Sequence, residues 1–146
     1  LNDQDFVTLE THADDGVVDS SDDKALEIGH YHERCYVDPF ALTFEITVQE
    51  ALRGATIVGA NPAFDAAFLR ERWCQSMWHH RLLDIEAYAM GALGYDVPQG
   101  LATLSADLRD RGFEIPQPDH TAAGDVATTR ACHHALRDIY REMRTA

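Results

Sequence analysis

The chain has 146 residues, 45% of them hydrophobic, and a formal net charge of −13 at pH 7. This length and apolar content predict one globular domain over residues 1–146 and exclude a wholly disordered chain. No apolar run reaches the roughly 20 residues that a membrane span needs, so we expect a soluble protein. The acidity argues against a protein that neutralises many phosphates over a broad face, but it is compatible with an enzyme whose carboxylates hold divalent cations.

Three cysteines, Cys35, Cys74 and Cys132, lie far apart in the sequence and form no CxxC pair. An odd number without metal-ligand spacing indicates neither a disulfide framework nor a zinc site. We therefore expect a reducing, cytoplasmic location, in line with the lack of a secretory leader before Leu1.

The first half of the chain contains signals for two strands and two helices. Residues 6–10 alternate apolar with polar side chains and predict a half-buried strand, and residues 24–28 predict a short helix. Residues 47–50 have the form of a capping box, which predicts a helix that begins there and ends at Gly54. The β-branched run at 56–59 then predicts a short buried strand.

Asn61 follows this strand and is expected to be the N-cap of a helix over residues 62–73, whose first position is a proline. Phe64 and Phe68 are one turn apart, and we interpret them as core residues. A carboxylate in the first turn, such as Asp65, indicates by itself only a favourable interaction with the helix dipole.

The region after this helix is expected to form another strand and helix. Residues 78–84 predict a strand on which His79 and His80 point to opposite faces, so the two histidines do not readily share one metal ion. Residues 85–93 have helical spacing, and Gly94 is the predicted end of that helix.

The last third of the chain is expected to present a histidine between two helices. An amphipathic helix is predicted to begin near Leu101 and to end at Gly112. The prolines that follow predict an extended loop at 116–119 that delivers His120. Residues 121–144 contain no proline and place apolar side chains three to four apart, which predicts the longest helix of the chain, with arginines on its solvent face. The two late histidines of this helix are interpreted as surface or packing residues.

Three residues of these segments could act together in catalysis. Asp65 and Asp125 each lie near the start of a helix, and two such carboxylates can hold hard cations such as Mg²⁺ or Mn²⁺. His120 lies in the loop before Asp125, and a histidine is a suitable base for the proton of an attacking water. These are the parts of metal-assisted phosphodiester hydrolysis.

The same residues carry a resemblance to a known family. Residues 58–65 (VGANPAFD) resemble the second motif, and residues 120–125 (HTAAGD) the third motif, of the DEDDh 3′–5′ exonucleases. These are ribonuclease H-like proteins that include the proofreading subunits of bacterial replicative polymerases. The resemblance covers about residues 56–136 and depends on two motifs in the right order. It implies an α/β fold, with a ribonuclease H-like mixed sheet flanked by helices.

The resemblance also implies roles for five residues. Asp65 and Asp125 would be ligands of a two-metal Mg²⁺ or Mn²⁺ site, and His120 would be the general base that activates the attacking water. Asn61 and Phe64 would lie beside the substrate pocket. The implied partner is the 3′ end of a single-stranded nucleic acid.

The chain departs from the family at the first motif, an Asp-x-Glu on the opening central strand that supplies two of the four carboxylates. No Asp-x-Glu opens this chain. Residues 8–11 (TLET) retain Glu10 but have Thr8 at the position of the aspartate. We interpret residues 6–10 as a later strand and expect the first motif to precede Leu1, so that the first strand or strands are missing and the chain as given can be inactive.

Two other functions remain open at this stage. One is a catalytically inactive ribonuclease H-like module that acts in binding or assembly, which the missing first motif favours. The other is a metal-dependent phosphohydrolase that uses the same aspartates and histidine on small phosphate esters.

Overall fold

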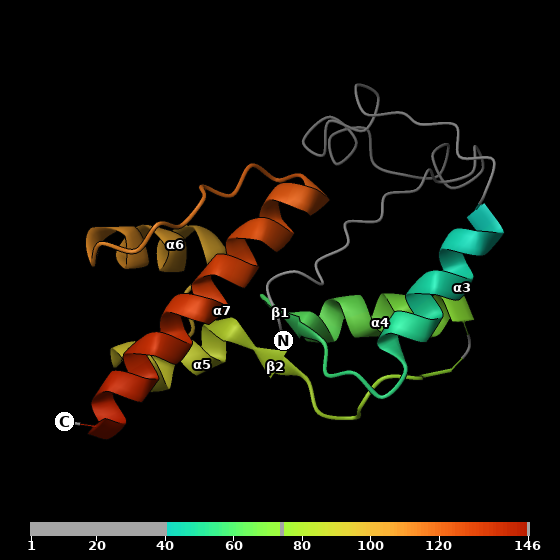
Figure 1. The fold of residues 1–146 in the computed structure, drawn as a ribbon, viewed down its shortest axis with the longest axis horizontal. Helices are drawn as coiled ribbons and strands as arrows, with labels where there is room; N and C mark the ends of the chain where they lie inside the picture. The colour runs from blue at the N-terminus through green and yellow to red at the C-terminus, as the bar shows by residue number, and fades with distance from the viewer. Residues whose placement is uncertain (1–40, 74, 146) are drawn as a thin grey trace. The chain divides into compact units, whose positions relative to one another are not determined.

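The computed structural model describes residues 41–73 and 75–145. The predicted strand at 6–10, the predicted helix at 24–28 and Glu10 lie outside these residues. Within them the chain is rich in helix and has one two-stranded parallel sheet, an α/β arrangement (Figure 1). In chain order the elements are α3 (Ala41–Leu52), β1 (Val58–Gly59), α4 (Pro62–Trp73), β2 (Leu83–Asp84), α5 (Ile85–Leu93), α6 (Leu101–Asp110) and α7 (Ala122–Thr145).

The strands β1 and β2 form a short parallel pair, with Val58 opposite Leu83 and Gly59 opposite Asp84. The Leu83 amide extends the ladder by donating to the Ile57 carbonyl at 2.9 Å. The helix α4 connects the two strands, as a parallel pair requires, because a hairpin turn cannot join strands that run in the same direction. The strand predicted at 56–59 is therefore confirmed in its last two residues, but the prediction that it is buried was wrong, because Val58 is 38% exposed.

The strand predicted at 78–84 is correct only for its final residues, which form β2. Trp78 is buried, and the His79 amide donates to the Ala55 carbonyl at 2.8 Å, but no ladder forms before Leu83. Without a regular strand the side chains do not alternate between two faces. His79 and His80 are both exposed, with ring centroids 4.3 Å apart, so the prediction that they point to opposite faces was wrong.

The buried side of the helix α4 is opposite to the side that the sequence predicts. Pro62 and Ala66 are its buried residues, whereas Phe64 and Phe68 are 66% and 70% exposed. Positions two residues apart differ by about 200° around a helix, so burial of the small residues turns the phenylalanines outward. Their rings contact each other, with centroids 6.2 Å apart. The interpretation of this pair as core was therefore wrong.

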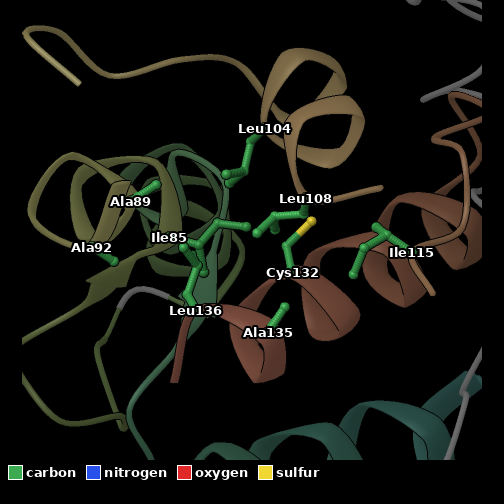
Figure 2. Close-up of a cluster of buried hydrophobic side chains, with 9 residues drawn as sticks. All are labelled: Ile85, Ala89, Ala92, Leu104, Leu108, Ile115, Cys132, Ala135 and Leu136. Carbon is green, nitrogen blue, oxygen red and sulfur yellow. The ribbon is translucent and has the colours of Figure 1, made fainter. Parts of the chain in front are cut away.

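The main core lies among α5, α6 and α7, which pack against one another. The buried side chains of α5 come from Ile85 and Ala89, and those of α6 from Leu104 and Leu108. Figure 2 shows Leu108 directed toward Cys132 of α7, whose thiol is free and buried. The remaining members of the cluster are Ala92, Ile115, Ala135 and Leu136. The amphipathic helix predicted to begin near Leu101 is thus confirmed as α6, and the long helix predicted at residues 121–144 as α7.

The ends of α5 follow the signals in the sequence. Asp84 is its N-cap, and the Oδ1 atom of Asp84 accepts hydrogen bonds from the amides of Glu86 at 2.9 Å and Ala87 at 3.5 Å. Gly94 ends the helix with φ of 76°, a conformation that glycine adopts without steric cost. The predicted boundaries of α5 are therefore confirmed.

The chain forms two compact units with their boundary after Ala51, near the end of α3. The helix α3 is therefore described by itself. It begins at Ala41, before the capping box that was predicted to start it at Thr47. A threonine followed three residues later by a glutamate is also compatible with the interior of a helix, so the pattern alone does not fix the first turn. Among the described residues, every helix is too short or too polar to serve as a membrane span.

Candidate functional site

The loop that carries His120 is fixed to the helices on either side of it. The carbonyl of Pro116 accepts a hydrogen bond from Nη1 of Arg109, on α6, at 3.1 Å. It also accepts one from Oγ1 of Thr128, on α7, at 3.4 Å. Thr128 is fully buried, and its one hydroxyl proton is shared between this carbonyl and the closer Gly124 carbonyl at 2.9 Å. These bonds hold the start of the loop against both helices.

The end of the loop is fixed by a cap on α7. The Oδ1 atom of Asp119 accepts hydrogen bonds from the amide of Thr121 at 2.9 Å and from its hydroxyl at 2.8 Å. The Thr121 hydroxyl in turn accepts from the Gly124 amide at 3.0 Å, which satisfies one of the free amides of the first helical turn. A Cβ atom at Gly124 would overlap the Asp119 carboxylate, so this arrangement requires glycine at that position.

His120 and Asp125 are in direct contact within this loop. The backbone amide of His120 donates to Oδ1 of Asp125 at 3.2 Å. The amide of Asp125 donates to the Thr121 carbonyl at 2.9 Å, which fixes the aspartate in the first turn of α7. The His120 side chain is exposed. The aspartate therefore fixes the backbone that presents the imidazole.

The segment that resembles the second motif, residues 58–65, forms the turn from β1 into α4. The carbonyl of Asn61 accepts a hydrogen bond from the Phe64 amide at 3.1 Å, which starts the helix. A Cβ atom at Gly59 would lie 3.2 Å from the Pro62 Cβ, so the strand end and the helix start are closely packed. Asp65 lies in the first turn of α4, and Phe64 beside it is exposed.

Desolvation raises the pKa of Asp65 above its usual value, and its own backbone amide acts in the opposite direction. The residue is nevertheless exposed at the surface, so its carboxylate is accessible from solvent.

Asn61 and His120 share an unusual backbone conformation. They have φ of 58° and 63°, and they are the two residues other than glycine with positive φ in the described part of the chain. Left-handed backbone is disfavoured for residues with a Cβ atom, although asparagine and histidine tolerate it better than most. Asn61 directly precedes α4, and His120 lies two residues before α7, so each is close to a first helical turn that carries one of the candidate aspartates.

The structure brings His120 and Asp125 together, and it brings Asn61, Phe64 and Asp65 together, each set within its own motif. Across residues 41–73 and 75–145, no group of three or more histidine, cysteine, aspartate or glutamate side chains is positioned to hold one metal ion. The assignment of Asp65 and Asp125 to one metal site therefore stays a prediction.

Sequence reasoning did not identify the residues that position the histidine loop. Asp119 and Thr121 form a local Asp-x-Thr pattern followed by glycine, which is a recognisable capping signal. Arg109 and Thr128 act through the Pro116 carbonyl, and a bond between side chain and backbone of this kind leaves no signal in the sequence.

An Asp-x-Glu does occur in the middle of the chain, at Asp84-Ile85-Glu86. Asp84 caps α5 through its carboxylate. Desolvation raises the pKa of Glu86, and the nearby Asp84 raises it further, whereas a hydrogen bond with the Leu101 backbone lowers it. The structure therefore gives Asp84 a role in capping.

Comparison of this chain with known protein families, with curated proteins and with solved structures found no match in any of the three.

Proposed function

We propose that this chain is a DEDDh-type 3′–5′ exonuclease with a ribonuclease H-like fold, which acts in the cytoplasm on single-stranded nucleic-acid 3′ ends. The observation that supports it most is the left-handed backbone at both Asn61 and His120. Strained residues gather at functional sites, where the surrounding structure holds them in place. Here the strain occurs in both segments that resemble exonuclease motifs, and the two are separated by almost 60 positions.

In this proposal Asp65 and Asp125 would hold Mg²⁺ or Mn²⁺, for which carboxylate oxygens are suitable ligands. When bound, the cations would stabilise negative charge on the attacking and leaving oxygens. His120 would take a proton from the attacking water, and its exposed position permits this. Asn61 and Phe64 would contact the terminal nucleotide, since Phe64 offers an exposed ring to a base.

The hydrogen bonds that fix the His120 loop would help this histidine to act as a base. A general base acts efficiently only when it is held at the right distance from its proton. The bonds of Pro116 at one end and of Asp119 at the other restrict where the His120 backbone can lie. The bond from the His120 amide to Asp125 holds the backbone that carries the proposed base beside the proposed cation ligand.

The first test separates metal binding from catalysis. We expect calorimetry with Mn²⁺ to show binding that is lost in Asp65→Ala and in Asp125→Ala. Asp138→Ala is the matched control, because this exposed α7 aspartate pairs only on the surface, with Arg141 at 3.2 Å. Absence of Mn²⁺ binding to the unmodified chain would contradict the proposal that this chain holds the cations.

The second test concerns the base. His120→Asn should abolish stepwise shortening of a 5′-labelled oligonucleotide from its 3′ end while Mn²⁺ binding persists. Asparagine tolerates left-handed backbone, so this substitution removes the imidazole and retains the loop conformation. Loss of Mn²⁺ affinity in this variant would show instead that His120 is a ligand.

A second candidate function is an inactive ribonuclease H-like module that binds or assembles. It is favoured by the lack of a preformed cluster of three potential ligands among the described residues. Nucleic-acid binding that needs no divalent cation, with no shortening of the oligonucleotide, would support this alternative.

A further inference from the structure

One face of α7 carries most of the positive charge near the end of this acidic chain. Residues 41–146 contain ten basic side chains, all arginine, and four of them lie on α7. At 3.6 residues per turn, side chains three, four and seven positions apart share one side of the helix. We call this side the basic face of α7; its members are Arg130, His133, His134, Arg137, Tyr140, Arg141 and Arg144.

The basic face lies opposite the stripe that packs into the core. Buried α7 residues such as Thr128 and Cys132 lie on the other side of the helix, and the buried Leu136 marks the boundary, one turn from His133 and Tyr140. Of the two carboxylates in this part of α7, Glu142 falls outside the basic face by the same helical geometry. Asp138 lies at the edge of the face, four residues after His134, and pairs with Arg141 at 3.2 Å.

Aromatic rings accompany these charges. Tyr140 is 44% exposed, and the guanidinium carbon of Arg144 lies 6.0 Å from its ring centroid. Tyr88 of α5 extends the group, with its ring centroid 6.2 Å from that of Tyr140 and 6.5 Å from that of His133. Arginines beside exposed rings can meet phosphates and unstacked bases at once, because a base stacks on an aromatic ring.

His133 lies in positive surroundings. Its pKa is lowered first by burial, and then by Arg137 and His134. The local field on this side of α7 is therefore positive, although the chain as a whole is negative.

We propose that the basic face of α7 binds a single strand of nucleic acid, with Arg137 and Arg144 on phosphates and Tyr140 stacked on a base. Nucleic acid is inferred as the ligand from charge complementarity together with the exposed ring of Tyr140. An acidic peptide would pair with the arginines but would not stack on this ring. The inference rests on the proposed function in one respect: it assigns to this face the part of the strand that precedes the reacting 3′ end.

The test uses a double charge reversal and a matched control. Arg137→Glu/Arg144→Glu changes two members of the basic face, and Arg53→Glu/Arg81→Glu changes two exposed arginines outside α7 by the same total charge. Anisotropy of a labelled oligothymidylate, measured without divalent cations, reports binding without cleavage. We expect about a tenfold or greater loss of affinity in the first variant, and a salt dependence shallower by about 1.4 in log–log slope. The control should change by less than about threefold.

Further variants separate charge from stacking. Tyr140→Ala should weaken binding and Tyr140→Phe should retain it, because stacking needs the ring and not the hydroxyl. Arg137→Lys/Arg144→Lys should retain most of the affinity. Equal losses in the two reversed variants, or competition by polyglutamate as strong as by an unlabelled oligonucleotide, would overturn the proposal.

Cleavage of a dinucleotide with Mn²⁺ distinguishes this inference from the proposed function. A dinucleotide is too short to extend beyond the reacting end, so the Arg137→Glu/Arg144→Glu variant should cleave it at the unmodified rate. If no variant cleaves any substrate, the exonuclease proposal fails, while the anisotropy result still decides whether the basic face binds a strand.

Discussion

At the scale of single residues, the most informative finding is that Asn61 and His120 both have left-handed backbone. Such a conformation costs about 1 kcal/mol or more for most residues with a Cβ atom, and less for asparagine. The cost is sustained at His120 because Asp119, Thr121 and Asp125 fix the loop around it. The positions that sequence resemblance assigns to a site are thus also positions where local stability is sacrificed.

Gly124→Ala tests whether the cap on α7 positions the histidine. The new methyl group would displace the Asp119 carboxylate and break its bonds to Thr121. We expect a net destabilisation of about 1 kcal/mol, because the lost hydrogen bonds outweigh the gain in helix propensity. Exonuclease activity should fall more than stability does, as measured by oligonucleotide shortening beside urea denaturation.

Gly91→Ala is the matched control for this change. Gly91 lies within α5, is exposed, and has open space where the added methyl group would lie. Here only helix propensity acts, so the variant should be more stable by about 0.5–1 kcal/mol, with unchanged activity. Equal responses at Gly91 and Gly124 would show that the Asp119 contact is unimportant.

At the scale of elements, capping signals and apolar periodicity located the helices from α4 to α7. Pro62, Asp84 and Gly94 fix their ends for reasons that are local in the sequence. The prediction that was wrong concerned the buried side of α4, which depends on tertiary packing. The spacing of Phe64 and Phe68 shows that they share a side of α4, but not that the smaller Pro62 and Ala66 face inward.

The candidate site was predictable to a similar degree. The contact between His120 and Asp125 follows from residues five positions apart in one capped loop. The anchoring of Pro116 by Arg109 and Thr128 joins two helices to one carbonyl, and no periodicity or short motif encodes such a bond. The strand predicted before Leu83 failed for the same reason, since a strand exists only where a partner completes its ladder.

Tyr95→Phe tests how the segment after α5 is held against α6. The Tyr95 hydroxyl donates to Oδ2 of Asp107 at 2.5 Å. Removing it should cost about 1 kcal/mol at neutral pH, measured by chemical denaturation, because a partly buried bond to a carboxylate is lost. Tyr140→Phe, on the exposed side of α7, should change stability by less than about 0.5 kcal/mol.

The same bond predicts a dependence on pH. Burial, followed by the hydrogen bond and the charge of Asp107, raises the pKa of Tyr95 to about 12. The folded state therefore holds this proton more tightly than the unfolded state, whose tyrosine titrates at about 10. The stabilisation is complete below pH 10 and is lost as the pH rises toward about 12. This loss should be smaller in Tyr95→Phe, and an equal loss would exclude Tyr95 as its source.

At the scale of the whole molecule, charge is unevenly distributed. Residues 1–40 contain eleven aspartates and glutamates but only Lys24 and Arg34, whereas residues 41–146 contain fourteen acidic and ten basic side chains. The basic face of α7 and the acidic excess therefore lie in different parts of the sequence. A chain of this kind can repel itself as a whole and still attract a polyanion locally.

Salt should therefore act in opposite directions on stability and on binding. Raising NaCl from about 20 mM to about 500 mM screens self-repulsion and should raise the melting temperature followed by circular dichroism. The same change should weaken oligonucleotide binding, because counterion release becomes less favourable. A melting temperature that falls with salt would show that attractive charge pairs, rather than net repulsion, dominate the fold.

The order of the packed elements also has a consequence for how the chain folds. The contacts of α5 with α7 enclose the whole of α6, and the pairing of β1 with β2 encloses the whole of α4, so both closures join distant parts of the sequence. The strand pair forms parallel bonds over only two residues of each strand, whereas the helices bury the main core. Because burial of apolar side chains offsets the entropy of closure in the helices and so few bonds offset it in the strands, the three-helix cluster is expected to form first in the folding transition state, and the strand pair to be added to it afterwards.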